Sequence, residues 1–266
     1  MPELPEVETI RRALAPRLHG RTLVAAESHP SDKFTPAHLA VGSVITDVGR
    51  RGKYLLLALD VDRELVIHLG MTGSISIGDG PVDDPYMRAS WQLDDGDTMA
   101  FRDVRRFGRI RVVPLGDHSS IPTLAAAGPE PFDDTFDGAH LYRALRSSSR
   151  RVKTQLLSQR PVAGIGNIYA DEALWLASVH PARRRITKAQ ADALAEAIVE
   201  VLEAGVDHGG TTLRDYRNLD GGTGANQYHL HCYGRAGQPC ERCHTPLRSK
   251  VIDARTSTWC PRCQAS

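Results

Sequence analysis

The stretch KYLLLALDVDRELVIHLGMTGSISIG, residues 53–78, contains three apolar runs separated by short polar or glycine-bounded breaks. Each run has the length of a β-strand and is rich in leucine, valine and isoleucine. Runs of this kind recur from residue 21 to about 113, as in RTLVAAES, SVITDVG, MRASWQL and RIRVVP. Short strands at this spacing predict a β-sandwich or barrel in the first half of the chain.

Helical patterns flank this β region. Before it, apolar residues recur at spacings of three or four and predict an amphipathic helix: Val7, Ile10, Leu14 and Leu18. Beyond LAAAGPEPFDD, helical patterns follow at about 138–147, 150–159 and 166–178. Another helix begins at TKAQ, where Thr187 and Gln190 form a capping box, and stops at Gly209-Gly210. The aperiodic segment after it predicts a long, mobile and functional loop.

Composition excludes several classes of protein. Of the 266 residues, 41% are apolar, which is enough for a core, but no apolar run approaches the ~20 residues that cross a bilayer. We therefore expect a cytoplasmic protein with no membrane contact. Residues 1–145 hold 16 Lys and Arg against 21 Asp and Glu, net −5, while residues 146–266 hold 17 against 11, net +6. The basic second half is compatible with a polyanionic partner.

The C-terminus carries the strongest local motif. Two CxxC pairs lie sixteen residues apart and supply four soft ligands: Cys240, Cys243, Cys260 and Cys263. This pattern predicts one tetrahedral Zn²⁺, and a filled thiolate set indicates a structural rather than a catalytic metal. The basic residues between the pairs indicate nucleic-acid contact, although a simple stabilising clip is the alternative. The fifth cysteine, Cys232, is predicted to be a buried free thiol.

A glycine-rich turn, GIGNIYADEALW, opens a predicted helix. It lacks the third glycine of the dinucleotide fingerprint, so we expect no nucleotide cofactor. The free N–H groups of the helix, with the amide of Asn167, suit a phosphate. A plain helix cap explains the same residues equally well.

Two loops of the β half carry apolar residues beside arginines. HLGMTG places Met71 between glycines, and DVRRFGR places Phe107 next to Arg105 and Arg106. Such side chains suit insertion into a base stack, and burial in the core is the alternative. Lys53 stands at the start of a predicted strand and is a candidate functional residue. The alternative is that it is an ordinary solvated lysine.

The opening, MPELPEVETI, combines a penultimate proline with three glutamates. Removal of Met1 would leave Pro2 with a secondary α-amine, and α-amines titrate at about 7.7 to 8.0, so a fraction is nucleophilic at neutral pH. Attack on the anomeric carbon of a sugar gives a cationic iminium, which acidifies the neighbouring C–H bond and promotes elimination. Glu3 is placed to protonate the ring oxygen of the sugar if burial keeps it protonated.

Taken together, the motifs resemble those of one family. PELPEVET, RRGKYLLL, HLGMTG, RRFG, VAGIGNIYADE and the four-cysteine finger with Arg255 follow the order typical of bacterial formamidopyrimidine-DNA glycosylases, across nearly the whole chain. The resemblance implies a bifunctional DNA glycosylase and AP lyase of base excision repair. Such an enzyme excises 8-oxoguanine and formamidopyrimidines through a Schiff base, followed by β- and δ-elimination.

The resemblance also implies residue roles. Pro2 is the expected nucleophile, Glu3 the general acid and Glu6 a supporting carboxylate, while Lys53 contacts the damaged strand and assists elimination. The void left by a flipped nucleotide is filled by Met71, Arg105 and Phe107. The phosphates flanking the lesion are bound by His68, Lys153, Asn167 and Arg255. Phosphate contacts position the protein, and the inserted wedge favours base extrusion.

The implied fold is α+β with two domains: an N-terminal β-sandwich flanked by helices, and a helix-two-turns-helix module followed by a zinc ribbon. We expect the catalytic sandwich at 1–130, the helical DNA-binding part with its lesion-recognition loop at 131–228 and the zinc finger at 229–266. The expected partner is damaged double-stranded DNA, bound by a monomer in the bacterial cytoplasm, where the protein acts at the nucleoid. One structural Zn²⁺ is the expected cofactor.

The chain departs from the family pattern at two places. Ser158 replaces an acidic residue, and the 211–230 region lacks the Gly-Tyr-Phe that many relatives carry. The second departure affects the expected lesion preference. Two alternatives stay open: an endonuclease VIII-like enzyme for oxidised pyrimidines, and a zinc-ribbon protein that binds lesions without cleaving them. A chain that begins with PEGPE would favour the endonuclease VIII-like enzyme, whereas this chain carries PELPE. The presence of Pro2, Glu3 and Lys53 argues against a protein that binds lesions without cleaving them.

Overall fold

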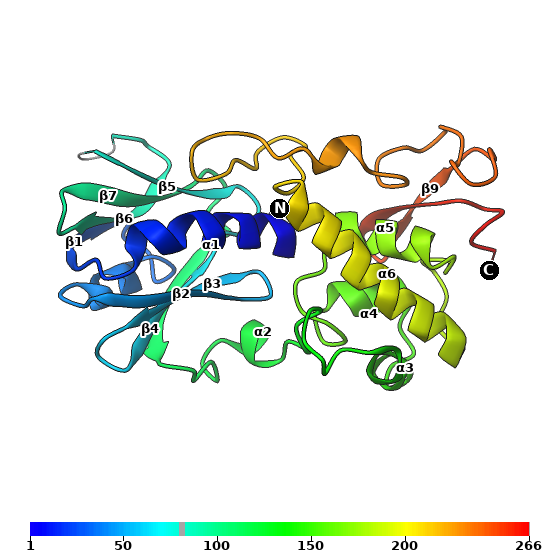
Figure 1. Ribbon diagram of the computed structural model, residues 1–266, viewed down its shortest axis with the longest axis horizontal. Helices are drawn as coiled ribbons and strands as arrows, with labels where there is room; N and C mark the ends of the chain where they lie inside the picture. The colour runs from blue at the N-terminus through cyan, green and yellow to red at the C-terminus, as the bar shows by residue number, and fades with distance from the viewer. Residues whose placement is uncertain (80–82, 266) are drawn as a thin grey trace. The chain divides into compact units, whose positions relative to one another are not determined.

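A computed structural model of the chain describes residues 1–79 and 83–265 (Figure 1). The chain divides into two compact units. Unit 1 contains residues 1–125 and 206–227, and unit 2 contains residues 126–205 and 228–266. Unit 1 is therefore built from two separate parts of the sequence. Within residues 1–79 and 83–265, no helix is long and apolar enough to span a bilayer.

Two four-stranded antiparallel sheets form the centre of unit 1. One has the order β2-β3-β4-β8, and its strands are β2 (Ile45–Arg51), β3 (Tyr54–Leu59), β4 (Arg63–His68) and β8 (Arg109–Pro114). The other has the order β1-β6-β7-β5, and its strands are β1 (Leu23–Ser28), β6 (Met87–Leu93), β7 (Asp97–Asp103) and β5 (Gly73–Asp79). The predicted β-sandwich is thereby confirmed.

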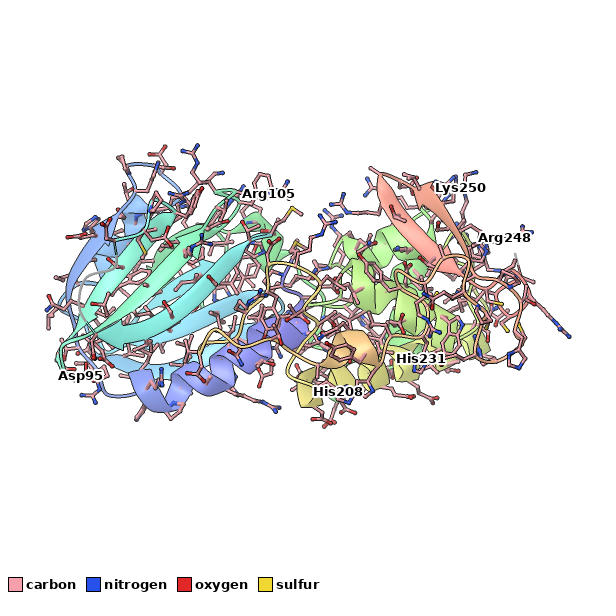
Figure 2. All side chains as sticks on the ribbon, turned by 90° about the horizontal axis from the view of Figure 1, so that it is seen from above. Asp95, Arg105, His208, His231, Arg248 and Lys250 are labelled. Atoms are coloured by element: carbon pink, nitrogen blue, oxygen red, sulfur yellow. The ribbon has the colours of Figure 1, made fainter. Side chains whose placement is uncertain are left out.

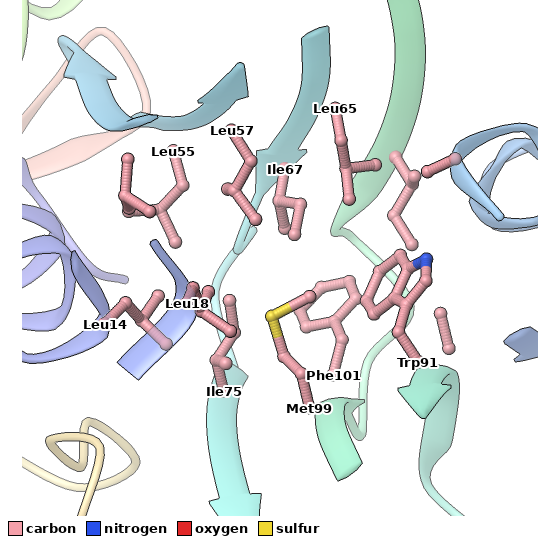
Figure 3. Close-up of a cluster of buried hydrophobic side chains, with 14 of the residues drawn as sticks. Leu14, Leu18, Leu55, Leu57, Leu65, Ile67, Ile75, Trp91, Met99 and Phe101 are labelled. Carbon is pink, nitrogen blue, oxygen red and sulfur yellow. The ribbon is translucent and has the colours of Figure 1, made fainter. Parts of the chain in front are cut away.

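The quoted stretch supplies β3, β4 and β5. In the β3–β4 pair, Tyr54 lies opposite His68 and Leu57 lies opposite Leu65, so the apolar faces of the two strands coincide. Leu55, Leu57, Leu65 and Ile67 project from one sheet toward Ile75, Trp91, Met99 and Phe101 of the other (Figure 3). Burial of this interdigitated layer supplies the main stabilisation of unit 1.

Helix α1 (Leu4–Leu18) runs alongside both sheets (Figure 1). Its buried face is the predicted one, with Val7, Ile10, Leu14 and Leu18 fully buried. Pro5 stands in the first turn, where a missing N–H costs nothing. The 3-10 helix η1 (Thr35–Ala40) and the short helix α2 (Pro122–Ala125) complete the N-terminal part of unit 1.

The segment 206–227 returns to the sandwich. Tyr216 is 7% exposed and Leu219 is 4% exposed, and both belong to the apolar cluster between the sheets. Residues 208–225 of the segment are irregular, as expected, and the 3-10 helix η2 (Asn226–Tyr228) follows them. The buried side chains of Tyr216 and Leu219 anchor the segment to the sandwich, and its mobility stays a prediction.

Unit 2 contains the predicted helices. These are α3 (Gly138–Arg146), α4 (Val152–Leu157), α5 (Asn167–Leu176) and α6 (Lys188–Asp207). The capping box of α6 is confirmed, because Thr187 N–H donates to Gln190 Oε1 and Gln190 N–H donates to Thr187 Oγ1, each at 3.1 Å. Gly209 and Gly210 follow α6 with φ values of +69° and +85°, as expected for a helix end.

The C-terminal ribbon of unit 2 pairs β9 (Arg248–Ile252) with β10 (Arg255–Trp259) in antiparallel register. Its two-residue turn, Asp253-Ala254, has φ values of +46° and +64°. Both residues therefore adopt the left-handed conformation that a type I′ hairpin turn requires. Arg248 and Lys250 project from this ribbon (Figure 2).

Candidate active site and nucleic-acid interface

The N-terminal residues form a buried carboxylate network. Pro2 is buried, Glu3 is 2% exposed and Glu6 is 1% exposed. Glu3 is the N-cap of α1, and its side chain accepts the Glu6 N–H, while Glu6 Oε2 accepts the Glu3 N–H at 2.7 Å. This reciprocal capping box fixes the peptide that directly follows Pro2. The sequence did not distinguish this capping role from a catalytic one.

The second oxygen of Glu6 bonds to the distant part of unit 1. Glu6 Oε1 accepts the Thr211 N–H at 2.6 Å. A Cβ on Gly210 would lie 3.0 Å from Glu6 Cγ and 3.0 Å from Tyr216 Cε1, so this position leaves little room for a side chain. Burial, reinforced by the nearby Glu6 carboxylate, raises the pKa of Tyr216. The phenol therefore stays neutral and donates to the Gly209 carbonyl.

Lys53 lies at the tip of the β2–β3 hairpin and is 8% exposed. It follows Gly52, whose φ of +55° suits the first position of a two-residue turn. The Arg50 guanidinium holds this tip to α1, because it donates to the Gly52 carbonyl at 3.1 Å and to Glu8 Oε2 at 3.1 Å. Burial opposes ionisation of Glu8, yet hydrogen bonds from three arginines lower its pKa to about 2.

His68 ends β4 close to Lys53. Burial, with smaller effects from the charges of Lys53 and Arg109, lowers the pKa of His68 to about 4. The imidazole is therefore neutral at pH 7. Its Nδ1 accepts the Gly70 N–H at 3.2 Å, which leaves the proton on Nε2. His68 lines a pocket of about 270 Å³ together with Tyr54 and Arg109, and a neutral N–H donor beside a guanidinium suits an anion.

Met71 and Phe107 are exposed rather than part of the core. Their side chains are 38% and 46% exposed. The Arg105 guanidinium carbon lies 4.7 Å from the centre of the Phe107 ring, and Arg105 projects from the end of the sandwich (Figure 2). A Cβ on Gly70 would lie 2.5 Å from Gly108 N, so the two loops pack backbone against backbone. The structure thus brings the three predicted wedge residues together on adjoining loops.

Asp103 was not identified from the sequence, although it organises these loops. It is fully buried, and its Oδ2 accepts the Gly108 N–H at 2.7 Å. Its Oδ1 accepts the Thr72 hydroxyl at 2.5 Å and the Arg105 N–H at 3.3 Å. The signal available in the sequence was a lone acidic residue between Arg102 and Val104, two positions before RRFG.

In unit 2, Lys153 lies inside the protein. Lys153 is 1% exposed, and its Nζ lies 2.6 Å from Asp171 Oδ1 and 3.0 Å from the Thr256 carbonyl. Asp171 Oδ2 accepts the Thr258 N–H at 2.9 Å. Burial raises the pKa of Asp171 to about 6, against the opposing effect of the Lys153 charge. The pair therefore joins α4 and α5 to strand β10, and the predicted phosphate contact of Lys153 stays a prediction.

Glu172 also escaped sequence reasoning. Its carboxylate accepts three consecutive backbone N–H groups, those of His231, Cys232 and Tyr233, at 2.6 to 2.8 Å. Glu172 thus holds the chain that leads into the ribbon.

Asn167 is the first residue of α5, as predicted, and its Oδ1 is buried with no hydrogen-bond partner in the described part of the chain. The predicted phosphate contact of Asn167 stays a prediction.

The four predicted ligand cysteines converge. Their Sγ atoms all lie within 4.8 Å of one another, and all four are free thiols. Cys240 Sγ lies 4.0 Å from Cys263 Sγ, and Cys243 Sγ lies 3.4 Å from Cys260 Sγ. A tetrahedral Zn–S site with bonds of ~2.3 Å places its sulfurs about 3.8 Å apart, so the set fits Zn²⁺. A side-chain hydrogen bond from Thr245 lowers the pKa of Cys243 to about 6, whereas burial raises the pKa of Cys260 and of Cys263.

Cys232 does not belong to this set. It is fully buried, and its thiol donates to the Thr258 carbonyl at 3.1 Å. Burial raises its pKa, so the thiol stays protonated.

Arg255 is exposed at the start of β10. It directly follows the Asp253-Ala254 turn, which side chains at the start of α4 hold in place. Asp253 Oδ2 accepts the Thr154 hydroxyl at 2.5 Å, and Asp253 Oδ1 pairs with Arg151.

Family models match most of the chain. A formamidopyrimidine-DNA glycosylase N-terminal domain matches residues 1–110, a formamidopyrimidine-DNA glycosylase H2TH domain matches residues 127–217, and a zinc finger found in FPG and IleRS matches residues 237–265. The three matches follow one another in the order in which the sandwich, the helices and the ribbon occur.

Whole-length relatives give the same result. Proteins named formamidopyrimidine-DNA glycosylase are similar to this chain: that of Deinococcus radiodurans is 45% identical over 277 residues, covering 99% of this chain and 97% of its own. The crystal structure of MutM (Fpg) from Thermus thermophilus has a TM-score of 0.92 at 44% identity, covering 100% of this chain and 99% of its own. An Fpg variant of Lactococcus lactis in complex with Fapy-dG containing DNA has a TM-score of 0.91 at 31% identity and covers 100% of both chains.

Proposed function

The chain belongs to the formamidopyrimidine-DNA glycosylase family and is a DNA glycosylase of base excision repair, and we propose that Pro2 is its nucleophile. Lyase action at abasic sites is consistent with this membership. The observation that supports the proposal best is the bond between Glu3 N–H and Glu6 Oε2 at 2.7 Å. It holds the backbone on the C-terminal side of Pro2. Once Met1 has been removed, the Pro2 nitrogen therefore has fixed surroundings.

The proposed excision step begins once Met1 is removed. The lone pair of the Pro2 nitrogen attacks C1′ of the damaged nucleotide, and the bond from C1′ to the base breaks. The base leaves with that electron pair and takes up a proton. The Pro2 nitrogen, now bonded to C1′ and positively charged, loses its N–H proton, and its freed lone pair forms a second bond to C1′ as the ring C1′–O4′ bond breaks. O4′ takes a proton from Glu3, and an iminium remains between Pro2 and C1′. Glu3 is held beside Pro2 by its capping bond to the Glu6 N–H.

Elimination follows from the iminium. Loss of a C2′ proton expels the 3′-phosphate, and a second elimination expels the 5′-phosphate. We assign Lys53 to the damaged strand at this stage, because its ammonium is held at the tip of a hairpin that Arg50 fastens to α1. A cation at that position stabilises the charge of a departing phosphate.

The other predicted residues are proposed to position DNA. His68 offers a neutral Nε2–H, and Arg255 offers an exposed guanidinium on the ribbon. Met71, Arg105 and Phe107 are proposed to fill the space of the extruded nucleotide, since two of them are apolar yet exposed. Oxidised purines are the proposed lesions. Cys240, Cys243, Cys260 and Cys263 hold one structural zinc ion, which has no part in the bond changes.

Three broader expectations belong to the same proposal. We infer that the protein acts as a monomer, needs no nucleotide cofactor and works in the cytoplasm, where bacterial DNA lies. We also infer that residues 1–130, 131–228 and 229–266 act as the catalytic part, the helical DNA-binding part and the finger. Size-exclusion chromatography coupled to light scattering, with and without a lesion duplex, tests the first of these.

A borohydride trap tests the nucleophile. Borohydride reduces the iminium to a stable amine, so the mature protein should become covalently linked to a duplex with 8-oxoguanine opposite cytosine. Pro2→Gly should slow or abolish the linkage. Pro16→Ala is the control, since Pro16 lies in α1, the helix that follows Pro2, and its nitrogen is an amide. A fully active preparation in which mass spectrometry finds Met1 still attached would refute the proposal.

A further inference from the structure

The two ends of the 208–227 segment meet at Asn226. Asn226 Nδ2 donates to Thr211 Oγ1 at 2.8 Å, and Asn226 Oδ1 accepts from His208 Nδ1 at 3.1 Å. The Asn226 N–H donates to the Gly210 carbonyl at 3.1 Å. Asn226 is 4% exposed, its bond to Thr211 is buried and its bond to His208 is partly buried, so loss of the side chain leaves polar groups unsatisfied. They close the residues between Thr211 and Asn226 into a loop with a fixed base.

The base of this loop reaches the N-terminus in two further bonds. The Thr211 N–H donates to Glu6 Oε1 at 2.6 Å, and Glu6 Oε2 accepts the Glu3 N–H at 2.7 Å. Both oxygens of the Glu6 carboxylate are therefore engaged, one by the loop and one by the peptide after Pro2. The hydrogen-bonded path from Asn226 to the peptide that follows Pro2 therefore passes through two residues, Thr211 and Glu6.

The packing around the loop base leaves little freedom. A Cβ on Gly224 would overlap the Gly210 carbonyl oxygen, so the two chain segments at the base of the loop contact each other through their backbones. Gly224 N–H donates to Thr212 Oγ1 at 3.0 Å. Asn226 holds the Thr211 hydroxyl in this closely packed base, so we expect a change of the Asn226 side chain to displace Thr211 and with it the N–H that Glu6 accepts.

We propose that Asn226 is a positioning residue for base excision, which through Thr211 holds the Glu6 carboxylate and hence the Pro2–Glu3 peptide in its reactive place. This inference rests on the proposed role of Pro2. Expulsion of a base needs the amine, the acid and the sugar aligned at once, and a displacement of about 1 Å costs about a hundredfold. An abasic sugar is already an aldehyde in equilibrium with its ring form, so its reaction with an amine depends less on that alignment.

The test compares two duplexes in single-turnover kinetics. One carries 8-oxoguanine opposite cytosine, and the other carries a preformed abasic site. Asn226→Ala and the near-isosteric Thr211→Val should each slow base excision about tenfold or more, while cleavage of the abasic duplex changes less than about threefold. Thr211→Ser keeps the acceptor oxygen and should restore excision to within about twofold of the parent.

A double-mutant cycle decides whether the two side chains act through their shared bond. The double variant Thr211→Val with Asn226→Ala should excise no more slowly than the slower single variant, because the bond can be lost only once. Equal losses on both duplexes, unchanged excision, fully multiplicative losses, or failure of Thr211→Ser to restore excision would each overturn the inference. Failure of the parent to form a trapped complex with the abasic duplex would instead refute the role of Pro2.

Discussion

The ammonium of Lys153 lies 2.6 Å from the carboxylate of Asp171, and both side chains are almost completely buried, at 1% and 0% exposure. Asp171 also accepts the Thr258 N–H of the ribbon. A buried charge left without its partner is strongly unfavourable, whereas removal of both charges is much better tolerated. The pair therefore couples the fold of the helices to that of the ribbon.

We expect Lys153→Met and Asp171→Leu, made singly, to lower the free energy of unfolding by roughly 3 to 5 kcal/mol each. The double variant should lose clearly less than the sum of the two. Urea unfolding followed by tryptophan fluorescence measures this, since Trp175 and Trp259 lie in unit 2. The exposed pair Arg17–Asp220 offers a control: Asp220→Ala should cost less than about 1 kcal/mol. Additive losses in the double variant would contradict the coupling.

His68 should make stability depend on pH. Its pKa is about 4 in the folded protein and 6.5 in an unfolded chain, so the unfolded state alone binds this proton between those values. The contribution of His68 is complete above about pH 6.5 and is lost as the pH falls toward about 4. In His68→Asn, the proton uptake that accompanies unfolding near pH 5 should fall by about one. Denaturant unfolding at a series of pH values measures this uptake, and an unchanged slope would contradict the assignment.

Phe107 should affect excision without affecting stability. Because its ring is 46% exposed, Phe107→Ala should shift the melting temperature little. As part of the proposed wedge, it should slow excision of 8-oxoguanine about tenfold, because the vacated stack is no longer filled. Val104→Ala is the matched control, because Val104 is 41% exposed near the same loop and has no proposed role. Equal effects of the two variants on excision would remove Phe107 from the wedge.

Zinc removal should act on DNA binding. A strong chelator should release one zinc ion per chain and unfold the ribbon, because structural zinc sites contribute their binding free energy to folding. Affinity for a lesion duplex should then fall, most clearly at moderate salt, where phosphate contacts dominate. Cys232→Ser should retain one zinc ion, since Cys232 lies outside the ligand set. Unchanged DNA affinity after complete zinc loss would reduce the ribbon to a stabilising clip.

The sequence predicted the elements whose signal is local. The face of α1 and the capping box at Thr187 depend on residues a few positions apart, and the four cysteines form two pairs of that kind. Strand β7 was missed for a physical reason. It pairs with β5 on one side and β6 on the other, and its residues Thr98–Phe101 are all buried. Burial on both faces removes the alternation by which a half-exposed strand is found.

Two of the residues that sequence reasoning missed, Asp171 and Glu172, act over long separations. Asp103, Asp171 and Glu172 accept backbone N–H groups, and the groups bound by Asp171 and Glu172 lie about 60 to 87 residues away. Nothing near Glu172 in the sequence indicates that it will hold Cys232. The Thr211 N–H that reaches Glu6 is 205 residues distant. Such partners become visible only when the fold has been established.

The split composition of unit 1 sets the order in which the protein matures on the ribosome. Every strand of the sandwich is synthesised before residue 126, but Tyr216 and the Thr211 donor to Glu6 follow about 80 residues later. A nascent chain therefore exposes the apolar surface on which Tyr216 later packs while residues 126–205 are translated. The Glu6 carboxylate gains its second donor only after that delay, when residues 126–205 with most of the helices of unit 2 have already been synthesised.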